Sequence, residues 1–177
     1  TGQWLAVDGG VSAVVGGCMR YAMQTKKKQE QNLLKFGAEI PFIKHLGFTL
    51  HRMDGGHSEL HYEARPEHLN SFAVTHGGAT MALLDVAMAV AARSDTPDLG
   101  VVTIEMKTMF MQPSRGLLVA RGRLIHRTGS MAYAEGTVHD AEGRLCSHST
   151  GTFKYMRRSA PVAAGPGAAT SAQLPTD

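Results

Sequence analysis

Residues 76–92 read HGGATMALLDVAMAVAA, and between Ala79 and Ala92 they contain one charged side chain, Asp85, and one hydroxyl, Thr80. A helix that is apolar on every side is normally buried inside a protein rather than laid on its surface. At about 1.5 Å per residue this helix is too short to cross a membrane. The stretch therefore predicts a buried central helix.

Strand-like segments lie on both sides of this helix. Before it, residues 48–53 and 57–64 predict a hairpin across the turn Asp54-Gly55-Gly56. After it come four segments separated by short turns: 101–112, 117–127, 131–140 and 145–155. This order is typical of an α+β fold in which an antiparallel sheet wraps around one central buried helix. One sheet covers one side of the helix, and a second copy of the chain is the simplest cover for the other side.

The chain has 177 residues, of which 43% are hydrophobic and 19% charged, as expected for one folded domain. The predicted folded unit spans 27–157 and begins with a short polar helix at 28–36. We expect 1–26 to be a flexible extension. Residues 158–177 are mostly Ala, Gly, Pro, Ser and Thr, a composition typical of a disordered tail.

Charge and cysteine content narrow the function classes. The net charge of +3 comes from the segments before residue 29 and after residue 156, because residues 29–156 hold 12 Lys and Arg against 13 Asp and Glu. A nucleic-acid reader carries its positive stripe on the folded domain, so we expect no nucleic-acid partner. The two cysteines form no Cys-x-x-Cys pair, which argues against a disulfide scaffold or a zinc module. No apolar run has the length of a membrane span. We expect a soluble, cytoplasmic protein.

Asp85 is the most informative residue of the central helix. A carboxylate among apolar side chains costs several kcal/mol unless it is paired or reached by water. No Arg or Lys stands three or four residues away on either side. A lone, partly desolvated carboxylate has a raised pKa and suits a general base or a nucleophile. The structural alternative is an Asp that caps a loop or pairs with a distant Arg.

His76-Gly77-Gly78 stands at the start of this helix, where unpaired N–H groups point outward with the positive end of the helix dipole. Such donors can hold an oxyanion. Gly78 and Asp85 lie about 10 Å apart along the axis, too far to meet at one carbon, so an antiparallel neighbour helix would have to supply one of them. Asn70 is a candidate amide donor or a turn residue, and Thr103 opens the next strand.

The pattern N-x5-HGG-x6-D from Asn70 to Asp85, followed by TIEMKTMFMQP and GRLIHRTGSMAYAEGTVHDAEGRLCSHSTGTF, resembles hotdog-fold acyl-CoA thioesterases. The closest group is the phenylacetate-pathway (PaaI-like) type, together with the animal thioesterase superfamily member 2. The resemblance covers about residues 36–156. It implies a hotdog fold, pairing of two chains into one continuous sheet as a homodimer or a dimer of dimers, and an acyl-CoA substrate without cofactor or metal.

The resemblance also implies roles for individual residues. Asp85 matches the helix carboxylate, the Gly78 N–H the oxyanion donor, and Asn70 the amide that positions substrate or water, while Thr103 matches a hydroxyl on the next strand. Asn70 and Gly78 would face Asp85 and Thr103 of the partner chain. Further contacts to substrate, including CoA at the turn 126–131, are expected from His76, Gly77, Phe110, His126, Arg127, Gly129 and Ser130.

Two other functions fit such a fold. A hotdog dehydratase carries a motif of the type Gly-Asp-x-Asn-Pro-x-His, and nothing in this sequence matches it. A non-catalytic acyl-CoA-binding module, such as a fatty-acid sensor, would leave Asp85 idle. Sensors of that kind attach the fold to a DNA-binding domain, for which 26 residues before the folded unit are too few.

Overall fold

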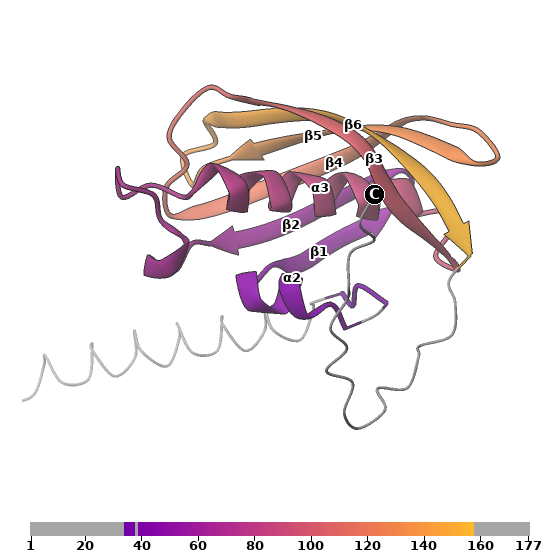
Figure 1. Ribbon diagram of the computed structural model, residues 1–177, viewed down its shortest axis with the longest axis horizontal. Helices are drawn as coiled ribbons and strands as arrows, with labels where there is room; N and C mark the ends of the chain where they lie inside the picture. Colours follow the sequence, from indigo (N-terminus) through magenta and orange to yellow (C-terminus); the bar gives the residue numbers. More distant parts are fainter. Residues whose placement is uncertain (1–33, 38, 158–177) are drawn as a thin grey trace, which may run out of the picture.

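The computed structural model describes residues 34–37 and 39–157, and these form one sheet wrapped around one long helix (Figure 1). The sheet has six antiparallel strands in the order β1-β2-β4-β5-β6-β3. Their bounds are β1 Thr49–Asp54, β2 His57–Glu63, β3 Leu99–Phe110, β4 Leu117–Arg127, β5 Met131–His139 and β6 Leu145–Arg157. The helices are α2 Pro41–Leu46, α3 Gly77–Arg93 and a short 3-10 turn at Pro66–His68. This is the hotdog architecture that the sequence predicted.

Helix α3 lies in the concave face of the sheet and contacts all six strands, as Figure 1 shows for the curved strands around it. Its buried side includes Leu83, Leu84, Ala87 and Met88, which are fully enclosed. Gly122 on β4 lets the backbones approach, because a Cβ there would collide with the Ala87 carbonyl. The core therefore lies between the sheet and one side of α3, and the opposite side of this helix is also mostly apolar.

Among the residues that the structure describes, no strand of the sheet covers the other side of α3. Six of its incompletely buried residues recur at helical spacing, which places them on one stripe: Gly78, Met81, Ala82, Asp85, Val86 and Ala89. Beside this stripe runs β3, an edge strand that pairs with β6 alone. Large apolar side chains are exposed along and just beyond β3, among them Val102, Ile104, Met109, Phe110 and Met111. These side chains and the stripe on α3 form one mostly apolar surface beside the edge strand.

The predicted helix at 28–36 differs from the structure where the structure describes it. Leu34 forms an isolated antiparallel bridge with Leu50, and its N–H donates to the Leu50 carbonyl at 3.0 Å. The Leu34 N–H thus pairs with the open edge of β1 instead of with a carbonyl of a helix. The predicted hairpin, central helix and four later strands are confirmed with ends moved by a few residues. The expected extension 1–26 and tail 158–177 lie outside the described residues.

Candidate active site

Asp85 and Thr103 are joined by a hydrogen bond. The Thr103 hydroxyl donates to Asp85 Oδ1 at 2.7 Å, which connects the uncovered side of α3 to the edge strand β3. Burial raises the pKa of the Asp85 carboxyl above its ordinary value, and the bond from Thr103 opposes this with a smaller lowering effect. Among the described residues no Lys, Arg or His forms an ion pair with Asp85. The carboxylate is therefore desolvated, oriented and unneutralised.

A β-bulge in β3 aims two side chains at α3. The register against β6 shifts between Thr103 and Glu105, so one extra residue is inserted at Ile104. Before the bulge, Val101 and Thr103 face the helix; after it, Met106 and Phe110 do. Strict strand alternation would have put Thr103 and Phe110 on opposite faces. The bulge places Thr103 on Asp85 and the Phe110 ring over Gly77 at the start of α3.

The start of α3 is capped by a histidine. His76 is the N-cap residue, and its Nδ1 accepts the N–H of Gly78 at 2.9 Å. The Gly78 N–H, which the sequence analysis expected to be a free oxyanion donor, is therefore occupied within its own chain. The N–H of Gly77, the first helical residue, donates to no acceptor in the described part of the chain. The first N–H groups of a helix have no partner within the helix, and they lie at the positive end of the helix dipole.

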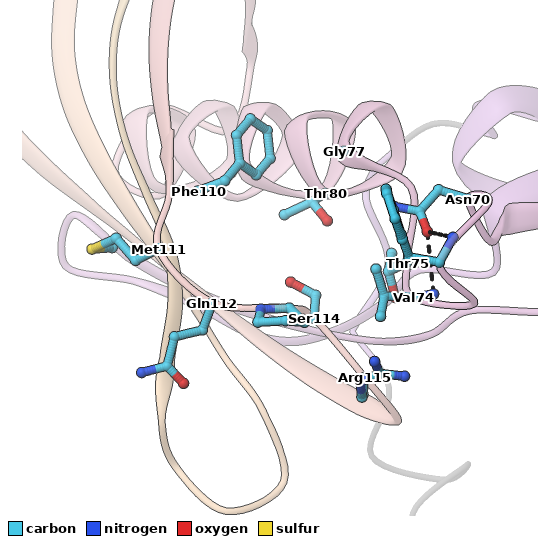
Figure 2. Close-up of a pocket in the computed structure, with 12 residues that line it drawn as sticks. Asn70, Val74, Thr75, Gly77, Thr80, Phe110, Met111, Gln112, Ser114 and Arg115 are labelled. Carbon is cyan, nitrogen blue, oxygen red and sulfur yellow. Dashed lines mark hydrogen bonds between the residues drawn. The ribbon is translucent and has the colours of Figure 1, made fainter.

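Asn70 holds the loop that leads into α3. Its Oδ1 accepts the backbone N–H of Phe72 at 2.9 Å and of Val74 at 3.3 Å, shown as dashed lines in Figure 2. Ala73 between them has a positive φ of 53°. Since Oδ1 is used by the loop, the Asn70 Nδ2 group is the part of the amide that remains to donate to a ligand. Asn70 is therefore at once a loop residue and a candidate donor.

The candidate catalytic residues, with Gly77 in place of the expected Gly78, fall into two groups within one chain. Asn70 and Gly77 lie at the N-terminal end of α3, and Asp85 with Thr103 lies eight residues further along the helix than Gly77. Eight residues correspond to about 12 Å of axial rise. One chain therefore places its carboxylate and its backbone donor too far apart to act on the same carbonyl.

A cavity of about 600 Å³ opens beside the first group. Figure 2 shows its labelled residues around an open space, with Gly77 and Thr80 on one side and Ser114 and Arg115 on the other. Apolar side chains provide much of the lining: Phe72, Val74, Phe110, Met111 and Pro113. Of the expected site residues, Asn70, Gly77 and Phe110 line it. Sequence reasoning missed Thr80, Ser114 and Arg115, whose available signals were the hydroxyl in an apolar helix and the turn Pro-Ser-Arg-Gly after a strand.

The turn expected to contact CoA lies at the tip of the β4–β5 hairpin. Thr128 Oγ1 accepts the N–H of Ser130 at 3.3 Å and of Met131 at 3.0 Å, so these two donors close the turn. The Arg127 guanidinium lies 5.6 Å from the centre of the Tyr155 ring. His126 stacks on Tyr133. The turn thus presents an exposed cation on an aromatic support, and Gly129 at its exposed tip.

Within residues 34–37 and 39–157, no three His, Cys, Asp or Glu side chains gather as possible metal ligands. Across the same described ranges, no helix has the length and hydropathy of a membrane span.

One known family model covers the central helix and most of the strands that follow it. The thioesterase superfamily model matches residues 72–147, which contain α3, its glycine start, Asp85 and Thr103. The matched stretch is 76 of the 177 residues and forms the central part of the folded domain. At the family level the activity is thioester hydrolysis, and the resemblance drawn from the sequence is confirmed. A provisionally named esterase of Thermoplasma acidophilum is 24% identical over 128 residues, 72% of this chain and 97% of the relative.

Solved structures agree in fold. The PaaI protein of the Escherichia coli phenylacetic acid degradation operon superposes with a TM-score of 0.62 at 20% identity, covering 76% of this chain and 93% of that one. A mutant of the phenylacetic acid degradation protein PaaI from Thermus thermophilus gives a TM-score of 0.59 at 26% identity, covering 65% and 98%. A thioesterase from Haemophilus influenzae gives 0.61 at 20% identity, covering 66% and 82%.

Proposed function

We propose that this protein hydrolyses an acyl- or aryl-CoA thioester to the free acid and CoA. The observation that carries the proposal is the unneutralised carboxylate of Asp85, desolvated in an apolar helix and held by Thr103. A carboxylate held in this way is poised for base or nucleophile work at a reactive carbonyl. Thioesters need no metal for this step, because their carbonyl is electrophilic and a thiolate is a good leaving group.

The active site would be shared between two chains. Gly77 and Asn70 of one protomer meet Asp85 and Thr103 of its partner when the two α3 helices run antiparallel across the open β3 edges. The uncovered helix stripe and the exposed apolar side chains along β3 support this pairing, since a soluble monomer rarely leaves such a surface in water. The cytoplasmic homodimer or dimer of dimers expected from the sequence belongs to this proposal.

In this arrangement the Gly77 N–H, rather than that of Gly78, stabilises the oxyanion. The reason is that the Gly78 N–H donates to His76 Nδ1. This bond occupies the Gly78 amide and holds the first turn of α3 in place, which leaves the Gly77 N–H for a ligand. The Asn70 Nδ2 group supplies a second donor. His76 then acts on the reaction through the backbone, as a positioning residue.

Hydrolysis of the thioester needs water as its only co-reactant. Asp85 takes a proton from water as the water oxygen attacks the thioester carbon, and the negative charge moves to the carbonyl oxygen at Gly77. The C–S bond then breaks, the CoA thiolate leaves, and the proton on Asp85 passes to it. If Asp85 attacks directly instead, an enzyme anhydride forms and water hydrolyses it. Single-turnover hydrolysis in ¹⁸O-labelled water tests for the second route: direct attack by water labels the acid, whereas hydrolysis of the anhydride at its Asp85 carbonyl labels Asp85 and leaves the acid unlabelled.

The test is release of free thiol from a panel of short, long and aromatic acyl-CoAs, with Asp85→Asn as the inactive comparison. Turnover that depends on Asp85 supports the proposal. Tight binding of acyl-CoA without turnover would instead favour a non-catalytic acyl-CoA-binding module. Hydration of an enoyl-CoA without thiol release would favour a dehydratase.

A further inference from the structure

Arg115 is the one charged side chain among the described residues that line the cavity. Its Nη1 donates to the Ala73 carbonyl at 3.3 Å, and it forms no ion pair with any carboxylate of the described chain. Five other arginines each pair with a carboxylate: Arg52, Arg65, Arg121, Arg123 and Arg144. A guanidinium has five N–H donors and no acceptor, so most of its donors remain for a ligand.

Arg115 lies across the cavity from the start of α3. The segment 114–115 runs beside 73–75, because the Thr75 N–H donates to the Ser114 carbonyl at 3.0 Å and Arg115 reaches Ala73. Gly77 follows Ala73 by four residues, at most about 14 Å of extended chain. Figure 2 shows Arg115 and Gly77 at opposite sides of the open space. The cavity thus runs from the proposed oxyanion donor to a cation, within the reach of a short acyl group.

The wall beside Arg115 is also polar. Thr75 and Ser114 are both buried there and both line the cavity. Thr75 Oγ1 has no hydrogen-bond partner in the described structure, and a buried hydroxyl is normally paired. The rest of the lining includes the apolar side chains Phe72, Val74 and Phe110. The cavity therefore combines an apolar surface with a polar, cationic wall.

We propose that the acyl group of the substrate ends in a carboxylate, which Arg115 binds while the thioester carbonyl lies at Gly77. The substrate class is then the CoA monothioesters of dicarboxylic acids, and the products are the free diacid and CoA. A carboxylate matches a guanidinium with two parallel hydrogen bonds, whereas a methyl end would offer no acceptor to Arg115 or to the unpaired Thr75 hydroxyl. This inference rests on the proposed function, because it names the substrate of the same site.

The test compares acyl chains of equal length with and without the terminal carboxylate, such as adipoyl-CoA against hexanoyl-CoA. Wild-type kcat/KM should favour the carboxylated member of the pair. Arg115→Gln should lower kcat/KM for adipoyl-CoA by about 10- to 100-fold and change that for hexanoyl-CoA by less than threefold. Arg115→Lys should keep part of the preference, because the charge remains while the paired geometry is lost. Arg52→Gln, a remote exposed control, should change neither substrate.

Two results would overturn the inference. If wild type shows no preference for the carboxylated chain, Arg115 does not select the acyl group. If Arg115→Gln damages both members of the pair equally, Arg115 contacts CoA itself or supports the loop at Ala73. Thermal melting of each variant separates the second result from a loss of folding.

A binding measurement keeps this inference separate from the proposed function. Calorimetry with two non-hydrolysable thioether analogues of CoA, one ending in a carboxylate and one in a methyl group, needs no turnover. Tighter binding of the carboxylated analogue, lost in Arg115→Gln, supports the cation site even if no thioester is hydrolysed. Equal affinities would refute the cation site even if hydrolysis is observed.

Discussion

The Thr103 hydroxyl donates to Asp85 Oδ1 at 2.7 Å, and this bond crosses from the edge strand to the uncovered side of the central helix. It stabilises the charged form of a carboxylate that burial would otherwise protonate more readily. Thr103 thus holds the pKa of Asp85 below the value that burial alone would give, and fixes the direction of one oxygen.

Replacing Thr103 should therefore change the pH profile as well as the rate. In Thr103→Val the lowering effect on the Asp85 pKa is lost, so the acid limb of kcat/KM should move to higher pH and kcat should fall by about tenfold or more. Thr103→Ser keeps the hydroxyl and should stay close to wild type. A rate loss in Thr103→Val with an unmoved acid limb would show that the residue acts by packing alone.

Asp85→Asn should lower kcat by roughly 10²–10⁴ without loss of the fold. It should also raise Tm. The folded state holds the proton on Asp85 more tightly than the unfolded state does, so ionised Asp85 lowers the stability of wild type as pH rises from the ordinary aspartate pKa through the raised one. The gain in Tm should thus be small in acid and larger at neutral pH. Activity within threefold of wild type in a folded variant would remove Asp85 from the mechanism.

Arg127→Ala tests the turn at the β4–β5 tip. Under the proposed function the exposed guanidinium would meet a phosphate of CoA outside the reacting centre, and such contacts contribute uniform binding. KM for acyl-CoA should rise several-fold with kcat nearly unchanged, and the effect should shrink at high salt. A truncated thioester without the nucleotide should be unaffected. Equal damage to the truncated substrate would show that Arg127 acts on folding or on the acyl pocket.

The open edge of β3 predicts the oligomeric state. Light scattering at micromolar concentration should give at least twice the chain mass of 19.0 kDa. Ile104→Lys places a charge on the exposed edge and should dissociate the dimer and abolish activity. Ile125→Lys, an equally exposed isoleucine on β4, should do neither. A wild-type monomer with full activity would contradict the shared site.

The main elements could be predicted from sequence because the hydrophobic pattern indicates which residues are buried and the turn residues mark where elements end. The apolar run around Asp85 predicted the central helix, and the lone carboxylate within it predicted an unneutralised group. The bulge at Ile104 could not be predicted, since strand alternation places Thr103 and Phe110 on opposite faces. Only the folded backbone shows that both face α3.

The capping of α3 by a side chain and the walls of the cavity could not be predicted from the sequence either. The glycine pair predicted free donors, yet the choice of amide depends on where His76 Nδ1 points, which is a rotamer rather than a sequence pattern. Arg115 looks like a solvated turn residue in the sequence. Its place opposite Gly77 depends on the pairing of 114–115 with 73–75, segments about forty residues apart in the chain.

The central claim is that one chain's Asn70 and Gly77 act with the Asp85 of its partner, and a mixed dimer tests it most directly. Asn70→Asp keeps the oxygen that holds the loop and removes the donor, and Asp85→Asn removes the carboxylate, so each homodimer should be nearly inactive. A dimer of one chain of each kind, purified through two different tags, contains one intact site and should recover about half of the wild-type activity. Activity no higher than that of the two parents would contradict the shared site.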